Sequence, residues 1–513
     1  MNANLFAVIR ERITSPANVL LRTGDGAVLS YGDMLERSGR IANILVLRGV
    51  EPGDRVAVQV EKSPQALMLY LATLRAGAVY LPLNTSYTLH ELDYFLGDAT
   101  PKLVVCDPAR RTGLEAITRR RAIGPLETLD AEGQGSLSTA AAAAPPDFAD
   151  VPREGDDLAA MLYTSGTTGR SKGAMLTHRG LSSNALTLAQ CWRFSDADVL
   201  LHALPIYHTH GLFTASNTVM VSGASMIFLP KFDADTVLRL LPNASVFMGV
   251  PTFYTRLLQH PELTKKACSH MRLCVSGSAP LLADTHQAFL QRTGHAILER
   301  YGMTETSMNT SNPYDGERRP GTVGMPLPGT ELRIADPQTG RLLGTEEIGV
   351  IEVRGPNVFA GYWGQPEKTR AEFRPDGFFI TGDLGKIDDR GYVHIVGRAK
   401  DLIISGGFNV YPKEVEAEID ALPGVVESAV VGVPHPDFGE GVTAVVVKKA
   451  EAAVSERSIL DALTGRLAKF KLPKRVVFAD QLPRNAMGKV QKNLLREAYL
   501  DLYASHASAP RRT

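Results

Sequence analysis

Short runs of β-branched and aliphatic residues alternate with helical patterns through the first part of the chain. DRVAVQV (54–60) precedes the helical pattern SPQALMLYLATLRAG (63–77), and the apolar runs AVYLPLN (78–84) and PKLVVCD (101–107) follow. Strands of parallel sheets are covered on both faces and therefore read as nearly continuous apolar runs. The alternation predicts an α/β architecture with buried, largely parallel strands.

The pattern of predicted secondary structure changes in the last third of the chain. A chain of 513 residues is too long for one compact core. Strand patterns dominate from about residue 344, as in IGVIEVRGPNVFAGYW (348–363), and a compact α+β segment that includes a helical pattern over 455–470 follows residue 398. We predict a large N-terminal domain, 1–398, with α/β layers and a β-rich subdomain, and a small mobile α+β lid, 399–513.

Composition limits the range of functions. The formal net charge is +0, so no strong field steers the chain to nucleic acid or to a membrane. No apolar run approaches the roughly 20 residues that span a bilayer, and the N-terminus lacks a signal-peptide core. The four cysteines fit neither a zinc site nor a disulfide framework: Cys106, Cys191, Cys268 and Cys274. We expect a cytoplasmic protein that binds neither nucleic acid nor membrane.

The stretch YTSGTTGRSKG (163–173) has the composition of a phosphate-binding loop. Its glycines allow backbone amides to approach an anion closely, its hydroxyls add donors, and Lys172 adds a positive charge. A Walker-type loop needs Gly before the lysine and Ser or Thr after it, whereas Ser171 and Gly173 flank Lys172. The loop is therefore of another type.

Four further motifs follow in order: YGMTE (301–305), TGD (381–383), GRAKDLIISGGFNVYPKEVE (397–416) and PRNAMGKVQK (483–492). With the phosphate loop, they make nearly the whole chain resemble the superfamily of acyl-CoA synthetases, peptide-synthetase adenylation domains and luciferases. The resemblance implies two half-reactions. A carboxylate attacks the α-phosphate of ATP to give an acyl-adenylate and diphosphate, and the thiol of coenzyme A then displaces AMP.

The resemblance also implies a nucleotide site. The loop is expected to hold the β- and γ-phosphates, Glu305 and Thr164 to bind Mg²⁺, Asp383 to accept the ribose hydroxyls and Tyr301 to face adenine. The residues expected to contact ATP or coenzyme A are Thr164, Ser165, Gly166, Thr167, Thr168, Gly169, Lys172, Ser278, Ala279, Tyr301, Gly302, Met303, Thr304, Asp383, Arg398, Gly406 and Gly407.

Lys489 is the expected catalytic residue of the C-terminal segment, since a lysine is a compact charge able to bridge the carboxylate and the α-phosphate. By the resemblance, the small domain pivots at Lys400 between the half-reactions, and SGGFN (405–409) then faces the pantetheine arm. His208 resembles the gate between the acyl and pantetheine sites. Acetylation of Lys489 by a protein acetyltransferase, reversed by a deacetylase, would remove the required charge.

The segments around the expected acyl pocket are similar to those of malonyl-CoA synthetases: ALPIYHTHGLF (203–213), GVPTFYTRLL (249–258), SGSAPLL (276–282) and ERYGMTETSMNTSNPYDG (299–316). A dicarboxylate needs a cationic partner for the carboxylate that does not react, ideally an arginine fork. Arg256 is the first candidate and Arg300 the second. His210 and Ser276 are expected to donate further hydrogen bonds, and Met308 and Thr209 to line the pocket beside the α-carbon, with room for methylmalonate.

Other functions remain open at this stage. They are a CoA ligase for another small acid, a free-standing amino-acid adenylation enzyme, a luciferase-like oxygenase and a non-catalytic nucleotide sensor. An amino-acid enzyme usually places an aspartate in the pocket, and PIYHTHGLF has no acid. A sensor would tolerate loss of Lys489 or Glu305, and both are present.

Overall fold

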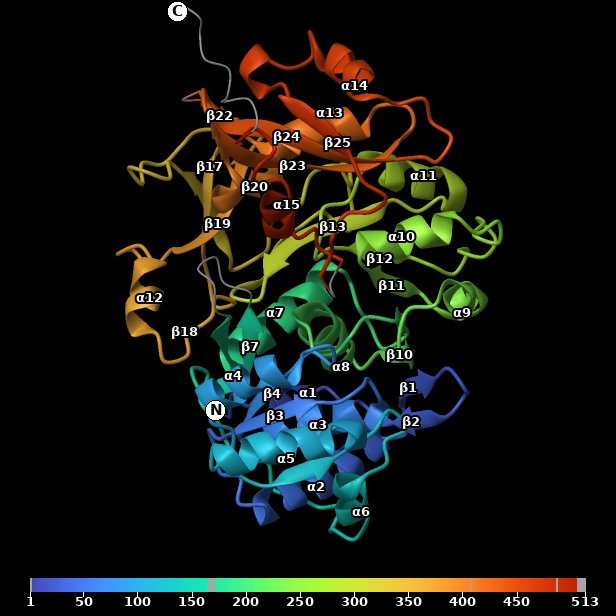
Figure 1. Cartoon of the computed structure of the whole chain (residues 1–513). Helices are drawn as coiled ribbons and strands as arrows, with labels where there is room; N and C mark the ends of the chain where they lie inside the picture. Colours follow the sequence, from blue (N-terminus) through green and yellow to red (C-terminus); the bar gives the residue numbers. More distant parts are fainter. Residues whose placement is uncertain (1, 165–170, 407, 486–487, 505–513) are drawn as a thin grey trace, which may run out of the picture. The chain divides into compact units, whose positions relative to one another are not determined.

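The structure is a computed structural model that describes residues 2–164, 171–406, 408–485 and 488–504 (Figure 1). The chain forms two compact units. Unit 1 comprises Met1–Leu332 and Val353–Phe379, and unit 2 comprises Arg333–Glu352 and Ile380–Thr513. The expected boundary after residue 398 falls within unit 2, and a mobile lid beginning at residue 399 stays a prediction.

Two largely parallel sheets form the framework of unit 1 in the described residues. The seven-stranded sheet has the order β18 (Gly361–Tyr362), β8 (Lys172–Thr177), β7 (Leu158–Thr164), β4 (Val79–Pro82), β3 (Arg55–Gln59), β5 (Leu103–Cys106) and β6 (Leu126–Thr128). The nine-stranded sheet has the order β15 (Met325–Pro326), β14 (Ser307–Ser311), β13 (Ile297–Met303), β12 (Leu273–Ser276), β11 (Val246–Gly249), β9 (Val199–His202), β10 (Ser225–Phe228), β1 (Val19–Thr23) and β2 (Val28–Ser30). The predicted α/β class is confirmed.

The helices of unit 1 begin where the sequence supplies caps. The Ser63 hydroxyl accepts from the Ala66 amide, and Pro64 occupies the first turn of α3, as expected for residues 63–77. The helical elements are α1 (Leu5–Arg10), α2 (Tyr31–Leu47), α3 (Pro64–Arg75), α4 (Leu89–Ala99), η1 (Pro108–Arg110), α5 (Arg111–Arg120), α6 (Ser136–Ala142), α7 (His178–Cys191), the π-helix η2 (His210–Ser216), α8 (Asn217–Val221), α9 (Ala234–Leu240), η3 (Leu241–Asn243), α10 (Pro251–Leu258), α11 (Ala283–Thr293) and α12 (Pro366–Ala371).

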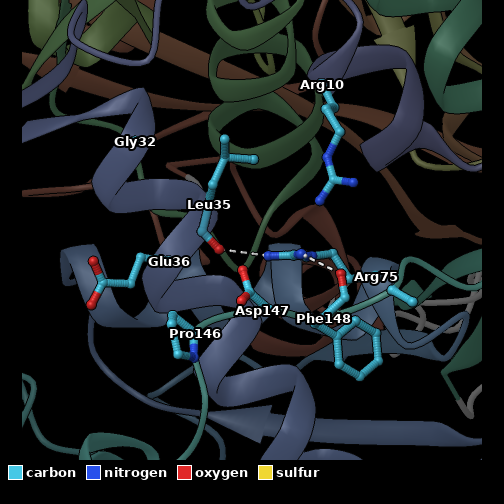
Figure 2. A pocket seen from close by; sticks show the side chains of 9 residues that line it. Arg10, Gly32, Leu35, Glu36, Arg75, Pro146, Asp147 and Phe148 are labelled. Atoms are coloured by element: carbon cyan, nitrogen blue, oxygen red, sulfur yellow. Dashed lines mark hydrogen bonds between the residues drawn. The ribbon is translucent and has the colours of Figure 1, made fainter.

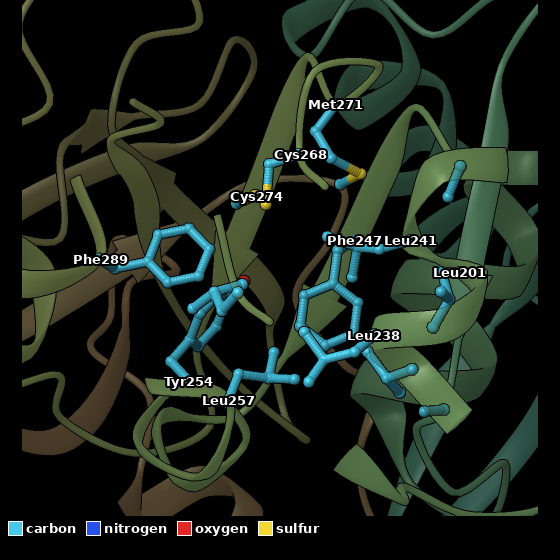
Figure 3. Packing of buried hydrophobic residues seen from close by; sticks show 14 of the residues in the cluster. Leu201, Leu238, Leu241, Phe247, Tyr254, Leu257, Cys268, Met271, Cys274 and Phe289 are labelled. Carbon is cyan, nitrogen blue, oxygen red and sulfur yellow. The ribbon is translucent and has the colours of Figure 1, made fainter. Parts of the chain in front are cut away.

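An apolar cluster packs α10 and α11 against the nine-stranded sheet (Figure 3). The Tyr254 ring lies edge-on to Phe289, with centroids 5.1 Å apart, and edge-on to Phe247, 5.6 Å apart. Its hydroxyl donates to the Val275 carbonyl at 2.8 Å. These contacts fix the carboxyl ends of β11 and β12, where the expected acyl-pocket residues begin.

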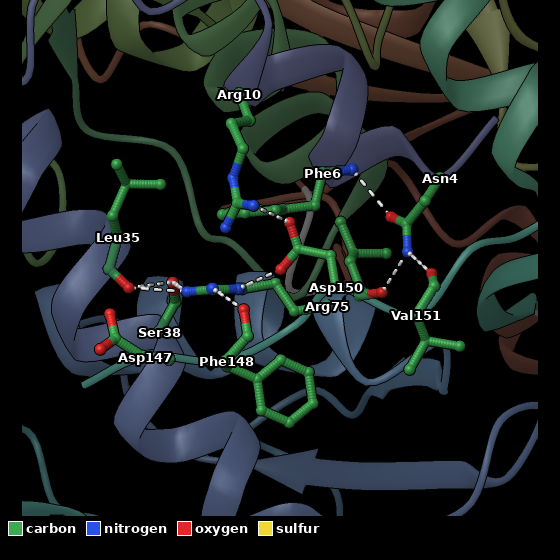
Figure 4. Close-up of polar contacts among 12 residues, drawn as sticks. Asn4, Phe6, Arg10, Leu35, Ser38, Arg75, Asp147, Phe148, Asp150 and Val151 are labelled. Carbon is green, nitrogen blue, oxygen red and sulfur yellow. Dashed lines mark hydrogen bonds and ion pairs between the residues drawn. The ribbon is translucent and has the colours of Figure 1, made fainter. Parts of the chain in front are cut away.

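Arg75 ties α2, α3 and the segment 147–150 together (Figure 4). Its guanidinium donates to Asp150, to the carbonyls of Leu35 and Phe148 and to the Ser38 hydroxyl, at 2.6 to 2.9 Å. Figure 2 shows that Arg75 also lines a surface pocket. Because its three nitrogens are already engaged by the protein, Arg75 stabilises the fold and has little left to offer a ligand.

Unit 2 contains the α+β segment and part of the β-rich segment, whose residues 353–379 belong to unit 1. Its larger sheet has the order β22 (Phe408–Val410), β21 (Ile403–Ser405), β24 (Gly439–Lys448) and β23 (Val425–His435), with β25 (Arg475–Phe478) paired to β24. A four-stranded sheet lies largely in this unit, in the order β16 (Glu331–Ala335), β17 (Gly349–Arg354), β19 (Phe379–Ile387) and β20 (Val393–Arg398). The helical elements are η4 (Ala399–Asp401), α13 (Pro412–Asp420), α14 (Glu456–Leu463), η5 (Lys469–Lys471) and α15 (Lys492–Ala498).

One expected element is shorter than its pattern. The helix predicted over 455–470 ends at Leu463, because Thr464 is extended and Gly465 has a φ of +86°. No helix in the described part of the chain is long and apolar enough to cross a membrane.

Candidate active site

The expected phosphate loop connects two paired strands of unit 1. Thr164 ends β7, Lys172 begins β8, and the two residues are antiparallel partners. The predicted loop residues Ser165, Gly166, Thr167, Thr168 and Gly169 lie outside the described residues. The two residues that flank the loop therefore lie side by side at the same end of the β7–β8 hairpin.

Glu305 lies at this end of the hairpin, next to Thr164, with which it is predicted to bind Mg²⁺. The Thr164 hydroxyl donates to Glu305 Oε1 at 3.3 Å, and the Tyr362 hydroxyl lies 3.2 Å from the same atom. The Glu305 carboxylate is buried. In the described residues, no group of three or more His, Cys, Asp or Glu side chains is arranged to hold a metal. Two adjacent oxygen donors suit Mg²⁺, which usually keeps waters and takes further ligands from substrate phosphates.

Lys172 is also buried and has a protein partner. Its Nζ lies 3.4 Å from Glu372 Oε1 and 4.7 Å from the centroid of the Tyr362 ring. Burial raises the pKa of Glu372, but Lys368, Tyr362 and Lys172 together leave it below its usual value. The sequence reasoning missed Tyr362 and Glu372. No local pattern marks them, because they reach Lys172 and Glu305 only through the fold.

Several residues that are expected to contact ATP lie at or just after strand ends of the nine-stranded sheet. Ser278 and Ala279 follow β12 and are half-buried, and Ser278 has a φ of +71°. The other members of this group are also half-buried: Tyr301, Gly302 and Met303 at the end of β13, and Thr304 in the turn after it.

The residues expected to form the acyl pocket include a buried arginine. Arg300, on β13, is 3% exposed, and its Nε and Nη2 atoms have no hydrogen-bond partner among the described residues. Burial lowers the pKa of Arg300 to about 9. The guanidinium packs against Gly277, where an added Cβ would lie 2.4 Å from Arg300 Cζ. A buried cation without a counter-ion is costly unless a ligand supplies one.

Three other predicted acyl residues also present buried polar atoms without partners in the described part of the chain. They are the Thr209 hydroxyl, the Ser276 hydroxyl and His210 Nε2. His210 Nδ1 lies 3.2 Å from the Ser278 hydroxyl. Burial, and then the nearby charge of Arg300, hold the pKa of His210 well below its usual value, so its imidazole is neutral. These donors suit an anionic or strongly polar ligand.

Other predicted acyl-side residues have different surroundings. Met308, on β14, is buried and is the register partner of Gly302. His208 is half-buried, and its Nδ1 accepts from the His210 amide at 3.3 Å. Arg256 lies on the exposed face of α10, whose Tyr254 and Leu257 are buried. Burial therefore ranks Arg300 ahead of Arg256, the reverse of the expected order, and the role of Arg256 stays a prediction.

Unit 2 carries the remaining predicted residues. Asp383 and Arg398 are register partners on β19 and β20, and Arg398 Nε lies 2.6 Å from Asp383 Oδ1. Lys400, in η4, is exposed. Gly406 has a φ of +61°, which favours glycine, and Gly407 lies outside the described residues.

Lys489 is exposed and follows Gly488, whose φ is +74°. Its amide donates to Asn485 Oδ1 at 3.0 Å, and its carbonyl accepts from the Asn485 amide at 2.9 Å. These two hydrogen bonds hold the backbone of Lys489 to Asn485.

The arrangement of sheets with these motifs defines the adenylate-forming class of enzymes. Residues 9–363 match the AMP-binding enzyme family, and residues 414–489 match the AMP-binding enzyme C-terminal domain. The chain belongs to the AMP-binding enzyme family. It is an ATP-dependent acid–thiol ligase that uses coenzyme A as co-substrate.

Individual relatives cover almost the whole chain. A feruloyl-CoA synthase from Amycolatopsis sp. is 37% identical over 96% of this chain and 98% of its own length. A malonate–CoA ligase from Arabidopsis thaliana is 34% identical over 92% of this chain and 85% of its own. The crystal structure of ATP-bound MatB from Rhodopseudomonas palustris is 65% identical, covers 98% of this chain and 100% of its own, and has a TM-score of 0.96.

Proposed function

We propose that the protein is a malonate–CoA ligase. Malonate, ATP and coenzyme A would give malonyl-CoA, AMP and diphosphate through a malonyl-adenylate. The observation that carries the proposal is Arg300, a buried guanidinium whose Nε and Nη2 have no partner among the described residues. A carboxylate can accept two parallel hydrogen bonds from such a fork.

The geometry favours a dicarboxylate over a monocarboxylate. An apolar acyl tail beside Arg300 would leave the charge buried and unpaired, which is strongly unfavourable. The second carboxylate of malonate would pair with Arg300 and could also accept hydrogen bonds from the Thr209 and Ser276 hydroxyls and from Nε2–H of the neutral His210 ring. The similarity to a malonate–CoA ligase and to MatB supports this reading. The similarity to a feruloyl-CoA synthase keeps a CoA ligase for another acid as the alternative.

The site also fits the ATP half-reaction. Glu305 and Thr164 would hold Mg²⁺, which neutralises phosphate charge when bound. Lys172 would exchange Glu372 for phosphate oxygens. In unit 2, Asp383 would accept the ribose hydroxyls, and Lys489 would supply the positive charge between the attacking carboxylate and the α-phosphate.

The thioester half-reaction requires that Lys489 leave the reacting atoms. We propose a pivot at the exposed Lys400, with the Gly406 turn then facing the pantetheine arm and His208 acting as the gate. Lys400→Pro, which fixes φ, should slow thioester formation more than adenylation.

The exposed Lys489 also suits control by acetylation. Acetylation would remove the charge that adenylate formation needs and would leave the acyl pocket unchanged. The partners would be a protein lysine acetyltransferase and a deacetylase. Peptide mass mapping of protein from cells tests this, and absence of acetyl-Lys489 under all growth conditions would contradict it.

The deciding experiment measures diphosphate release with ATP, Mg²⁺ and coenzyme A across acetate, propionate, malonate, methylmalonate, succinate and ferulate. We expect the highest kcat/KM with malonate and lower activity with methylmalonate. A preference for a monocarboxylate would leave the ligase chemistry intact and reject the dicarboxylate pocket.

A further inference from the structure

The π-helix η2, which begins at His210, is held at its first turn by a buried imidazole. His202 ends β9 and is fully buried. Its Nε2 lies 2.8 Å from the Gly211 carbonyl and 3.1 Å from the Ser216 hydroxyl, and that hydroxyl donates to the same carbonyl at 3.0 Å. His202, on β9 of the nine-stranded sheet, thus holds the Gly211 carbonyl, which directly follows His210.

The Gly211 carbonyl and Lys62 together determine which ring nitrogen of His202 carries hydrogen. Lys62 Nζ lies 2.9 Å from His202 Nδ1 and 2.8 Å from the His202 carbonyl. Burial holds the pKa of Lys62 well below its usual value, but its nitrogen can donate to Nδ1 in either protonation state. The Gly211 carbonyl can only accept, so Nε2 must be the donor and Nδ1 the acceptor of the bond from Lys62. The hydrogen of the neutral ring is therefore on Nε2 and points to Gly211. Burial, and then the charge of Lys62, hold the pKa of His202 well below its usual value, which keeps the ring neutral.

The placement of Lys62 is unfavourable on its own. The side chain is 6% exposed, and within the described residues no carboxylate forms an ion pair with it. It also directly precedes Ser63, the N-cap of α3, where the helix dipole disfavours a cation. Its Nζ also lies 4.2 Å from the centroid of the Phe228 ring. A buried lysine in such a position is a candidate for a role in the acid-binding pocket rather than in general stability.

We propose that Lys62 and His202 are positioning residues for the acid-binding pocket. Lys62 stabilises this tautomer of His202, His202 fixes the Gly211 carbonyl, and the first turn of η2 then directs His210 Nε2 and the Thr209 hydroxyl toward the acid. The proposal rests on the proposed function, in which these atoms and Arg300 receive the second carboxylate of malonate. Neither residue contacts the substrate.

Two substitutions at one position separate this role from simple packing. In His202→Gln, the terminal amide takes the place of Nε2–H and keeps the donor to Gly211. In His202→Asn, the side-chain oxygen takes the place of Nδ1 and keeps only the acceptor for Lys62. We expect His202→Asn to raise the KM for malonate about tenfold, with the KM for ATP within about twofold of the parent. We expect His202→Gln to stay within about threefold for both substrates.

His295 provides the matched control, because its Nε2 also contacts a backbone carbonyl, that of Cys268 at 3.0 Å, without a link to η2. His295→Asn and His295→Gln should lower Tm without separating the two KM values. Lys62→Met keeps the aliphatic stem but removes the donor to Nδ1, and it should raise the KM for malonate without changing the KM for ATP. If His202→Asn raises both KM values equally, or only lowers Tm as the His295 variants do, the positioning role is wrong.

Arg300→Gln in the same assay separates the two proposals. If Arg300→Gln leaves the KM for malonate unchanged, the proposed function fails and the positioning role fails with it. If Arg300→Gln raises that KM but His202→Asn does not, only the positioning role is overturned. Should Lys62→Met fail to fold, the His202 pair still decides the question.

Discussion

The backbone of Gly277 lies directly against the guanidinium of Arg300. A Cβ added to Gly277 would be 2.4 Å from Arg300 Cζ and 2.6 Å from Nη1. The atoms that would clash belong to the far end of a flexible side chain, so the guanidinium would move and the backbone would not. Gly277 thus keeps open the position that Arg300 occupies.

Gly277→Ala should therefore impair recognition of the acid while the protein still folds. We expect the KM for malonate to rise at least about tenfold, because a displaced fork loses bidentate pairing. The KM for ATP and the Tm should change little. Steady-state diphosphate release and thermal unfolding measure these values. Gly294→Ala is the control, since Gly294 also lies in unit 1 and a Cβ there would meet no atom within 4 Å, although its φ of +81° costs some stability. Equal kinetic effects of the two variants would contradict the prediction.

Arg300→Gln should reduce malonate activity more than Arg256→Gln does. Arg300 is buried without a counter-ion among the described residues, whereas Arg256 is exposed and well screened by water. Loss of a buried charged pair costs roughly 3–5 kcal/mol, or more than 100-fold in kcat/KM. Isothermal titration with ATP should show nearly unchanged binding for both variants. A larger malonate defect in Arg256→Gln would restore the order expected from sequence.

Lys489→Ala should abolish malonyl-adenylate formation and leave thioester formation from supplied adenylate nearly intact. Removal of one positioned charge from a transition state costs on the order of 100- to 1,000-fold. The two half-reactions are measured separately, by diphosphate release and by consumption of synthetic malonyl-adenylate with coenzyme A. Lys492→Ala is a useful comparison, because Lys492 is an ion-pair partner of Glu416 and should affect stability first. Equal loss in both half-reactions would reject the role of Lys489.

Asp420 should make the stability of unit 2 depend on pH. Burial raises the pKa of Asp420 to about 6, although the Ser428 hydroxyl donates to it at 2.7 Å. The folded state then binds more protons than the unfolded state between about pH 4 and 6, so stability falls as pH rises through this range. The cost above pH 6 is at most about 3 kcal/mol.

Asp420→Asn keeps the acceptor for Ser428 and removes the charge. We expect the variant to be more stable than the parent at pH 7 and to show a flatter dependence of stability on pH. Denaturant unfolding at pH 4.5, 6 and 7.5, followed by a probe in unit 2, measures this. If parent and variant show the same dependence of stability on pH, Asp420 is not the responsible group.

Much of the framework could be predicted from local patterns. Continuous apolar runs such as 54–60 and 101–107 indicated buried parallel strands, and Ser63–Pro64 marked the start of α3. Gly465 ended a helix that the apolar periodicity alone extended to residue 470. Local signals succeed here because capping and strand burial depend on neighbours within a few residues.

The class of chemistry was also set by the sequence, since the phosphate loop, Glu305, Asp383 and Lys489 occur in motifs that resemble those of adenylate-forming enzymes. The tertiary structure decided which side chains are buried together. It placed Arg300 inside and Arg256 on the surface, brought Tyr362 and Glu372 to Lys172, and joined Lys62 to His202 across 140 positions of sequence. Desolvation determines the cost of an unpaired charge, and desolvation depends on packing between distant segments, which no local pattern records.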